Sequence, residues 1–200
     1  MSIVFENVCK TFDGRMLFDN LNLSLKKGTL TCITGISGSG KTTFLRMLMG
    51  LEHPDSGRIS GLDNTVVSAV FQEDRLCPAL SASANAAIAL KKGKDRRYSD
   101  GILRSLGLGD DLNKPASVMS GGMRRRIAIA RALSADYDLL LLDEPFTGLD
   151  VANRNCALAC ILDNARNRTV IIVTHDPDIP ALAGGDLLDF KSPSAATNVK

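Results

Sequence analysis

Residues 29–43 read TLTCITGISGSGKTT, and this stretch decides the fold. Its first six residues are rich in β-branched side chains and predict a short strand. The next nine match the spacing GxxxxGK[ST], and the FLRMLMG that follows predicts a helix that stops at Gly50. A strand, a glycine-rich loop and a helix in this order predict a phosphate-binding loop in a parallel α/β sheet. The alternative is a turn that only links the two elements.

The glycine-rich loop supplies the groups that a nucleoside triphosphate needs. Glycines let successive backbone N–H groups turn toward phosphate oxygens, and the helix N-terminus adds a partial positive charge. Lys41 is expected to reach the β- and γ-phosphates, and Thr42 is expected to be a ligand of Mg²⁺. The other candidates in the loop, which offer bare backbone or hydroxyl donors, are Gly35, Ser37, Gly38, Ser39, Gly40 and Thr43.

A second strand is predicted at residues 139–142, which read LLLL directly before Asp143 and Glu144. Such an apolar run is typical of a parallel strand covered on both faces, and ligands bind beyond the carboxyl ends of these strands. Asp143 is therefore a candidate ligand of Mg²⁺, directly or through water, and Glu144 a candidate base that polarises an attacking water. The alternative is that both acids only cap the next helix.

Two further strands are predicted to end at the same edge of the sheet. Residues 169–174, TVIIVT, precede His175, and residues 66–71, VVSAVF, precede Gln72. A lone histidine after a strand is more often structural than functional, but one beside a phosphate loop is a catalytic candidate. Gln72 is expected to orient water or to contact the metal ion, so both residues join Glu144 as catalytic candidates.

Lys41 and Asp143 are about 100 residues apart, more than one short connection between α/β units requires. The alanine- and leucine-rich text between them predicts a small helical lobe, at about 76–125, inserted into a single domain that spans residues 1–200. MSGGMRRR at 119–126 closes this lobe, and each glycine in a first helical turn costs roughly 1 kcal/mol relative to alanine. KKGKDRR at 91–97 is expected to be an exposed loop and not a nucleic-acid patch.

The composition is that of an ordinary globular protein. Lysine and arginine total 24 against 22 acidic residues, a net charge of +2, so the charge gives no reason to expect a nucleic-acid partner. Neither a secretory signal nor an apolar stretch of roughly 18 residues is recognisable. The five cysteines form no CxxC pair. Cys156 and Cys160 are expected on one face of a helix as buried, reduced thiols, with a metal site as the alternative.

The order of these motifs resembles that of the nucleotide-binding subunit of an ATP-binding cassette (ABC) transporter. The resemblance covers residues 3–189 and implies a P-loop NTPase core with a mixed parallel sheet, an N-terminal antiparallel β subdomain and the inserted helical lobe. It also implies an Mg²⁺-dependent ATPase. The motifs that carry it are the phosphate loop, Gln72, Ser120-Gly121-Gly122, Leu142-Asp143-Glu144-Pro145, Gly148-Leu149-Asp150 and His175.

Two subunits of this family dock head to tail around ATP. The resemblance implies that residues 120–122 of one subunit cover the ATP held by the other, which gives a reason for the two glycines. Phe12 matches the aromatic residue that stacks on adenine, with a core phenylalanine as the alternative, and Asp150 matches the acid that crosses the dimer interface. Met119 and Met123 stand where leucine and glutamine are usual, so one polar side chain near the nucleotide is missing.

The resemblance also implies transport. Residues 72–76, QEDRL, resemble a stretch of importers of the nitrate, sulfonate, taurine and thiamine type. The expected protein pairs as a homodimer or with a second ABC subunit and powers import through a separate integral membrane permease, with a substrate-binding protein as a further partner. It would lie peripherally at the cytoplasmic face of the inner membrane. The alternatives are a non-transport ABC clamp in DNA repair or translation and a small-molecule P-loop kinase.

Overall fold

A six-stranded sheet lies at the centre of the computed structural model, which describes residues 2–192 and 195–199. Its strand order is β5-β6-β7-β3-β8-β9, and all neighbours are parallel except β8 and β9. Every residue of β6 and β7 is buried, as expected of continuous apolar runs. The strands are β3 (Leu30–Gly35), β5 (Val67–Val70), β6 (Leu139–Asp143), β7 (Thr169–Val173), β8 (Asp186–Ser192) and β9 (Ala195–Val199).

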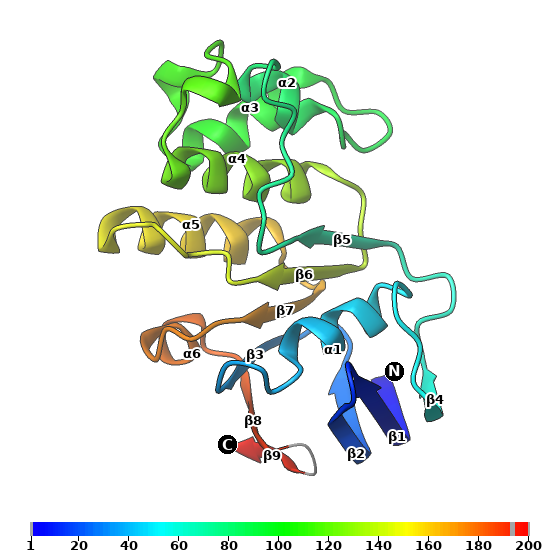
Figure 1. Ribbon diagram of the computed structural model, residues 1–200. Coiled ribbons are helices and arrows are strands. Elements are labelled where there is room, and N and C mark those ends of the chain that lie inside the picture. The colour runs from blue at the N-terminus through cyan, green and yellow to red at the C-terminus, as the bar shows by residue number, and fades with distance from the viewer. Residues whose placement is uncertain (1, 193–194, 200) are drawn as a thin grey trace.

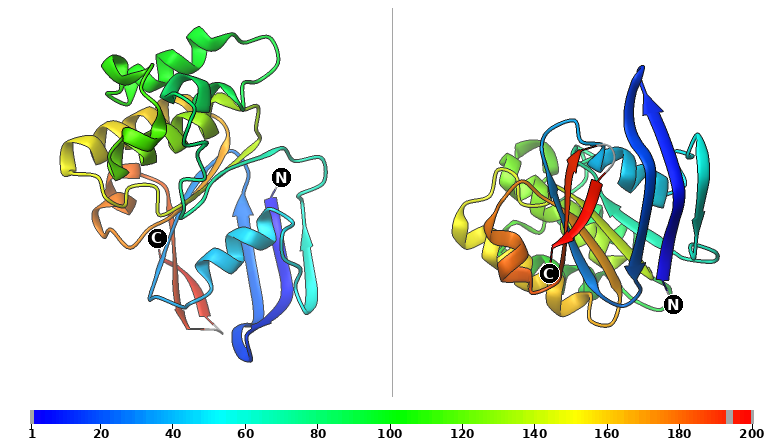
Figure 2. Two further views of the ribbon diagram at one scale, coloured as in Figure 1. Left: turned by 45° about the horizontal axis from the view of Figure 1, so that its top comes forward. Right: turned by 90° about the horizontal axis from the view of Figure 1, so that it is seen from below.

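A separate antiparallel sheet of order β2-β1-β4 forms the N-terminal β subdomain. Burial alternates along much of β2, because only one face of this sheet is covered. A turn at Asp13 and Gly14, both with positive φ, joins the first two strands. This sheet confirms the expected antiparallel subdomain, which stands apart from the parallel sheet in Figure 2. Its strands are β1 (Ser2–Phe12), β2 (Arg15–Lys26) and β4 (Ser56–Ser60).

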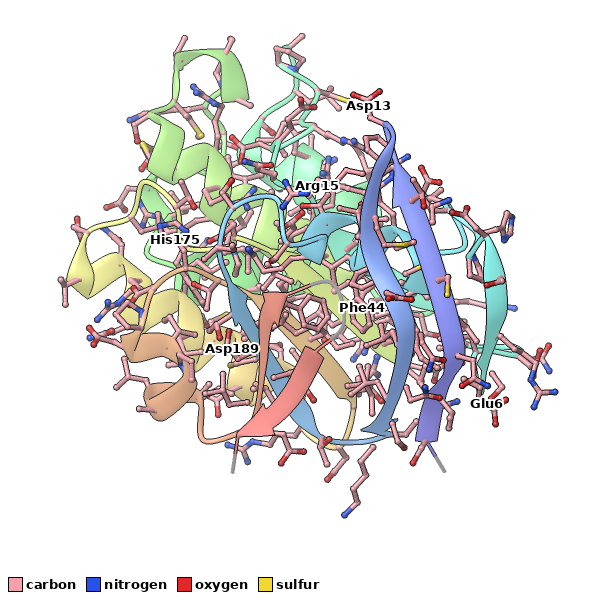
Figure 3. The ribbon with its side chains drawn as sticks, turned by 60° about the horizontal axis from the view of Figure 1, so that its bottom comes forward. Glu6, Asp13, Arg15, Phe44, His175 and Asp189 are labelled. Atoms are coloured by element: carbon pink, nitrogen blue, oxygen red, sulfur yellow. The ribbon has the colours of Figure 1, made fainter. Side chains whose placement is uncertain are left out.

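Helix α1 (Lys41–Leu48) lies between the two sheets and joins them through aromatic side chains. Its Phe44, labelled in Figure 3, stacks on Phe5 of β1 with ring centroids 4.8 Å apart. Phe44 also meets Phe190 of β8 edge to face at 5.2 Å, and Phe18 of β2 meets Phe190 at 5.7 Å. This cluster fixes the start of α1, and with it the glycine-rich loop, against both sheets.

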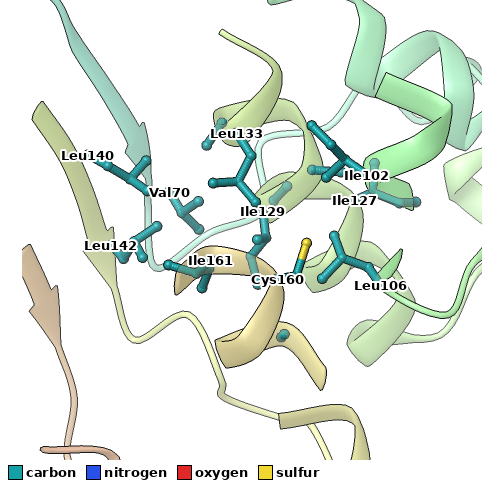
Figure 4. Close-up of a cluster of buried hydrophobic side chains, with 14 of the residues drawn as sticks. Val70, Ile102, Leu106, Ile127, Ile129, Leu133, Leu140, Leu142, Cys160 and Ile161 are labelled. Atoms are coloured by element: carbon teal, nitrogen blue, oxygen red, sulfur yellow. The ribbon is translucent and has the colours of Figure 1, made fainter. Parts of the chain in front are cut away.

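The other face of the parallel sheet is covered by α4 (Gly121–Ser134) and α5 (Val151–Asn164). Leu140 and Leu142 of β6 point into this layer, whereas Leu139 and Leu141 belong to the core around α1. Figure 4 shows Leu140 and Leu142 beside side chains of both helices. The alternation explains why residues 139–142 of β6 are all apolar. A short helix, α6 (Asp178–Ala183), contacts β3.

A helical lobe lies above the sheet in Figure 1 and consists of α2 (Ala82–Ala87), α3 (Arg96–Ser105) and the start of α4, which pack against one another. Two 3₁₀ turns, Gly109–Asp111 and Ala116–Val118, connect α3 to α4. Because α4 continues to Ser134 and also contacts β5, the expected lobe boundary at residue 125 falls inside a helix.

The basic stretch at 91–97 is a loop only in its first part. The carboxylate of Asp95 accepts a hydrogen bond from the backbone N–H of Arg97 at 3.0 Å and caps α3. The expectation of a loop is therefore wrong for Arg96 and Arg97, which are exposed helical residues. None of the helices in residues 2–192 and 195–199 has the length and apolar content that a bilayer span requires.

Candidate functional site

The glycine-rich loop leaves the end of β3 in a conformation that only glycine adopts readily. Gly35, Gly38 and Gly40 have φ values of 145°, 75° and 90°. A Cβ on Gly35 would lie 2.5 Å from the carbonyl oxygen of Phe190, and one on Gly40 would lie 2.9 Å from the Phe18 ring. Gly35 and Gly40 are thus needed both for backbone conformation and for space, and Gly38 is needed for backbone conformation.

Lys41, the first residue of α1, curls back into this loop. Its Nζ donates hydrogen bonds to the carbonyl oxygens of Gly35 and Ile36 at 2.7 and 2.9 Å. Burial lowers the pKa of the Lys41 ammonium, while the carboxylates of Glu144 and Asp143 act in the opposite direction. The ammonium therefore lies within the loop, where a phosphate chain would be bound.

The next residue, Thr42, joins α1 to the end of β6. Its Oγ1 donates to Oδ2 of Asp143 at 3.0 Å. Burial raises the pKa of Asp143, and this hydrogen bond offsets part of the effect. A hydroxyl and a carboxylate fit Mg²⁺, which prefers oxygen ligands and shares them with substrate phosphates. Across residues 2–192 and 195–199, no group of three or more His, Cys, Asp or Glu side chains could bind a metal without such help.

Glu144 follows β6 in an unusual backbone conformation. Its φ of 50° is left-handed, which costs a non-glycine residue about 1 kcal/mol. Its N–H donates to the carbonyl of Val173 at 2.9 Å, and its Oε2 lies 2.7 Å from Nδ1 of His175. The turn after β6 therefore directs the carboxylate toward the histidine after β7, which is labelled in Figure 3.

One cavity of about 500 Å³ at this edge brings together candidates from the ends of four strands, β3, β5, β6 and β7, and from the hairpin between β1 and β2. Phe12 lines it from the end of β1 and is 55% exposed, so it is not a core phenylalanine. Ser39 is absent from the lining, and its N–H donates within the loop to Ile36. The predicted residues that line this cavity are Phe12, Gly35, Ser37, Gly38, Gly40, Lys41, Thr42, Thr43, Gln72, Asp143, Glu144 and His175.

The remaining candidates line a second cavity of about 530 Å³. These are residues 120–122 at the start of α4 and Asp150, which caps α5 by accepting a hydrogen bond from the N–H of Asn153 at 2.8 Å. Gln72 and Thr147 line both cavities. One chain thus does not bring residues 120–122 together with its own phosphate loop.

The two glycines at the start of α4 differ in their surroundings. Ser120 caps the helix through a 3.2 Å hydrogen bond from the N–H of Met123. A Cβ on Gly122 would lie 3.0 Å from the carbonyl oxygen of Gly148, whereas one on Gly121 would meet only Arg124, at 3.9 Å. A side chain at Gly122 would therefore be in tight contact with the loop after β6, a reason for glycine that the sequence did not indicate, whereas Gly121 has room for a Cβ.

Sequence reasoning missed two arginines near these cavities. Arg15, which is labelled in Figure 3, lies on the hairpin between β1 and β2. Its Nη1 is 3.1 Å from the point where a Cβ on Gly38 would be. Arg125, in the basic run at 124–126, is only 3% exposed and contacts the loops after β5 and β6. In the sequence, the only signal for either arginine is that it lies beside a recognised motif. The contacts themselves arise only when the chain folds.

Comparison with known proteins agrees with this geometry. The family pattern described as ABC transporter matches residues 18–147. The Fe(3+) ions import ATP-binding protein FbpC of Agrobacterium fabrum is 42% identical over 201 residues, which cover 92% of this chain and 57% of that protein. The aliphatic sulfonates import ATP-binding protein SsuB 2 of Pseudomonas savastanoi pv. phaseolicola is 38% identical over 197 residues, which cover 94% of this chain and 73% of that protein.

Solved structures share the fold over nearly the whole chain. The dimeric structure of MJ0796, a bacterial ABC transporter cassette, superposes with a TM-score of 0.85 at 27% identity and covers 99% of this chain and 98% of the other. The chain spans only 57% of the length of the FbpC relative, so it corresponds to one part of such a protein. Sequence, fold and arrangement of the loops agree, and the chain belongs to the ABC transporter family.

Proposed function

We propose that this chain is the ATP-hydrolysing subunit that powers import of a solute through a separate membrane permease. The observation that carries the proposal is the position of Glu144. Its carboxylate lines the same cavity as the phosphate loop, bonds to His175 and follows Asp143, which contacts Thr42. The names of relatives, import ATP-binding proteins for Fe(3+) ions and for aliphatic sulfonates, support import as the direction.

The phosphate loop would bind the triphosphate of ATP. Its N–H groups and Lys41 would face the phosphates, and Ser37 and Thr43, which line the cavity, add hydroxyl donors. Phe12 offers an exposed ring for adenine at the rim of the same cavity. Thr42, Asp143 and Gln72 would hold Mg²⁺, which when bound neutralises phosphate charge and orients the terminal phosphate.

Glu144 would accept a proton from the water that attacks the γ-phosphate. Its Oε2 is bonded to His175, and the left-handed turn fixes the direction in which the side chain leaves the strand. A base that is already aimed loses little entropy on reaching the reacting geometry. His175 thus orients the carboxylate, and Gln72 at the boundary of both cavities is placed to orient the water.

A second ABC subunit, either a copy of this chain or a related cassette, would complete the site. Residues 120–122 and Asp150 line a separate cavity, so in one chain they have no access to the ATP of its own phosphate loop. Two chains docked head to tail would place this cavity over the partner's ATP. Support comes from structures described as dimeric for a cassette of the same fold.

The partner that receives this energy would be an integral permease, with a substrate-binding protein delivering the solute. The chain would then lie at the cytoplasmic face of the inner membrane through that permease. Its relatives are named as ATP-binding proteins of import systems, and those names differ in the solute, so the choice of solute is assigned to the partners.

Replacement of Glu144 by glutamine tests the proposal. Glu144→Gln preserves shape but cannot accept the proton, so steady-state ATPase should fall at least about 100-fold while ATP affinity by calorimetry stays within about threefold. The variant should accumulate as an ATP-bound dimer in size-exclusion chromatography. Glu6→Gln, a matched change at an exposed residue of β1, should retain the wild-type rate. Near wild-type turnover in Glu144→Gln would exclude Glu144 as the base.

A further inference from the structure

Arg125 is a buried cation in the second turn of α4, with only 3% of its surface exposed. Its Nη1 donates to the carbonyl oxygens of Phe71 at 2.5 Å and of Gln72 at 3.2 Å, and lies 3.4 Å from Oδ1 of Asp74. All three acceptors belong to the loop that follows β5. One half of the guanidinium therefore fixes the backbone on which Gln72 is carried.

The other half of the guanidinium reaches the end of β6. Nη2 of Arg125 donates to the carbonyl oxygen of Asp143 at 2.5 Å and to that of Glu144 at 2.7 Å. These carbonyls lie on either side of the left-handed turn at Glu144, whose φ is 50°. A bond to both carbonyls therefore opposes relaxation of this turn, and the turn sets the direction of the Glu144 side chain.

Both contacts start from the helix that begins at Gly121. Arg125 lies four residues further along α4, so one helical turn separates the contact from residues 120–122. The planar fork of an arginine presents two separate NH2 groups to two loops at once, a geometry that the compact ammonium of a lysine does not reproduce. Burial lowers the pKa of Arg125, yet an arginine side chain remains charged in proteins, so the carbonyl dipoles always face a cation.

We propose that Arg125 is a positioning residue for ATP hydrolysis, which joins the start of α4 to the backbones of Gln72 and Glu144 in one rigid unit. It acts through those two residues and does not itself contact the substrate. The inference rests on the proposed ATPase function of the chain. If ATP bound to a partner chain moves residues 120–122, this rigid unit carries the movement to Gln72 and Glu144 of the same chain.

The test compares two arginines on the same helix. Arg131 also donates to backbone carbonyls of the loop after β5, those of Asp74 at 3.0 Å and Arg75 at 2.7 Å, but its hydrogen bonds do not include residues 143 and 144. Arg125→Met and Arg131→Met remove the same fork and keep an aliphatic chain. Both variants of the full chain are assayed for steady-state ATPase, for ATP affinity by calorimetry and for thermal unfolding.

We expect Arg125→Met to lower kcat at least about tenfold, since small misplacement of a reacting group has effects of this size, while KM and ATP affinity stay within about threefold. Arg131→Met should keep kcat within about twofold of wild type. A merely structural role for Arg125 would lower the melting temperature and ATP affinity together and leave kcat, measured well below that temperature, unchanged. That result, or an equal loss of kcat in both variants, would overturn the proposal.

Arg125→Lys keeps the test decisive if Arg125→Met does not fold. The ammonium retains the charge but lacks the planar fork that spans both loops, so kcat should lie between those of wild type and Arg125→Met, at least about threefold below wild type. Wild-type kcat in Arg125→Lys would overturn the positioning role. The two proposals fail in different ways: absence of ATPase in the wild-type protein removes the proposed function, whereas an active wild type with equally active Arg125 variants removes only this inference.

Discussion

Two cations, Lys41 and Arg15, meet the glycine-rich loop. Lys41 donates to carbonyls inside the loop, and Arg15 reaches the loop from the β hairpin at Gly38. In a chain whose acidic and basic residues nearly balance, two cations beside one glycine loop form a local site for a polyanion. Lys41 belongs to a known motif, so Arg15 is the residue whose contribution remains to be measured.

Removal of Arg15 should weaken binding of phosphates more than binding of adenine. Arg15→Ala is expected to lower ATP affinity by about threefold to tenfold, because a charge-assisted hydrogen bond contributes about 1.5–3 kcal/mol and this guanidinium is exposed. Calorimetry with ATP, ADP and adenosine gives the comparison. Arg58→Ala, which removes another exposed arginine of the same sheet, is the control. Equal losses for ATP and adenosine would contradict a phosphate contact.

The difference between Lys41 and Arg15 shows what the sequence could predict at single positions. Lys41, Thr42 and the three glycines were predictable because the whole loop is contiguous in the chain. Asp143 and His175 were predictable because each ends an apolar strand, and parallel strands share one edge. Arg15 and Arg125 were not, because Arg15 contacts a loop 23 residues away and Arg125 contacts two loops, one 18 and one 54 residues away, and no local pattern encodes these distances.

Helix α5 begins after Asp150, the residue that caps it and lines the second cavity, and its inner face packs in the hydrophobic core. Cys160 is buried there, while Cys156, one turn earlier, donates from Sγ to the carbonyl of Ser105 in α3 at 3.0 Å. The expected placement of both thiols on one helix agrees with α5.

Apolar strands and helices were predicted well since their periodicity is local, but the start of α3 was not, because its cap, Asp95, lies inside a basic run.

Thiol labelling should separate the buried from the exposed cysteines. Burial raises the pKa of Cys32 to about 11 and that of Cys160 to about 12. At pH 8 their thiolate fractions are about one in a thousand and one in ten thousand, so an aromatic disulfide reagent should modify exposed Cys77 and leave these two intact. Their reactivity should rise with pH or on unfolding. Rapid labelling of Cys160 in native protein at pH 8 would show that α5 is not packed as described.

In the proposed function, the chain carries two halves of an ATP site in separate cavities. The phosphate loop lines one cavity and residues 120–122 line another, with Gln72 and Thr147 between them. Residues 120–122 would therefore contact ATP only when a second chain docks against this one. Gly121 offers the cleaner probe of that half, because only Arg124 lies near its Cβ position, whereas Gly122 packs on Gly148.

Complementation between two inactive chains tests the paired arrangement. Gly121→Asp should still bind ATP, because aspartate is tolerated in a first helical turn, but should not dimerise, since like charges a few ångströms apart repel by about 1 kcal/mol in water and more in a closed interface. Lys41→Ala should lose about tenfold or more in ATP affinity. A mixture of the two variants can form one composite site and should show ATPase above that of either alone.

Gly101→Asp is the control for this experiment, because Gly101 is an exposed glycine of α3 with open space at its Cβ position. This variant should dimerise and hydrolyse ATP as the wild type does. An unchanged rate in Gly121→Asp alone would mean that the start of α4 serves only the fold. No gain in the mixture, with both single variants folded, would argue against sites shared between chains.

The central place of β3 has a consequence for the order in which the protein is made. Its neighbours in the sheet are β7 and β8, so Leu30 pairs with Val170 and Thr31 pairs with Asp186. The ribosome therefore completes residues 35–43 long before it makes either strand that holds β3 in place. Long-range pairing of this type forms late and slowly. We therefore expect a nascent chain that stops before β7 to carry the full loop sequence without its fixed shape, and to bind ATP poorly.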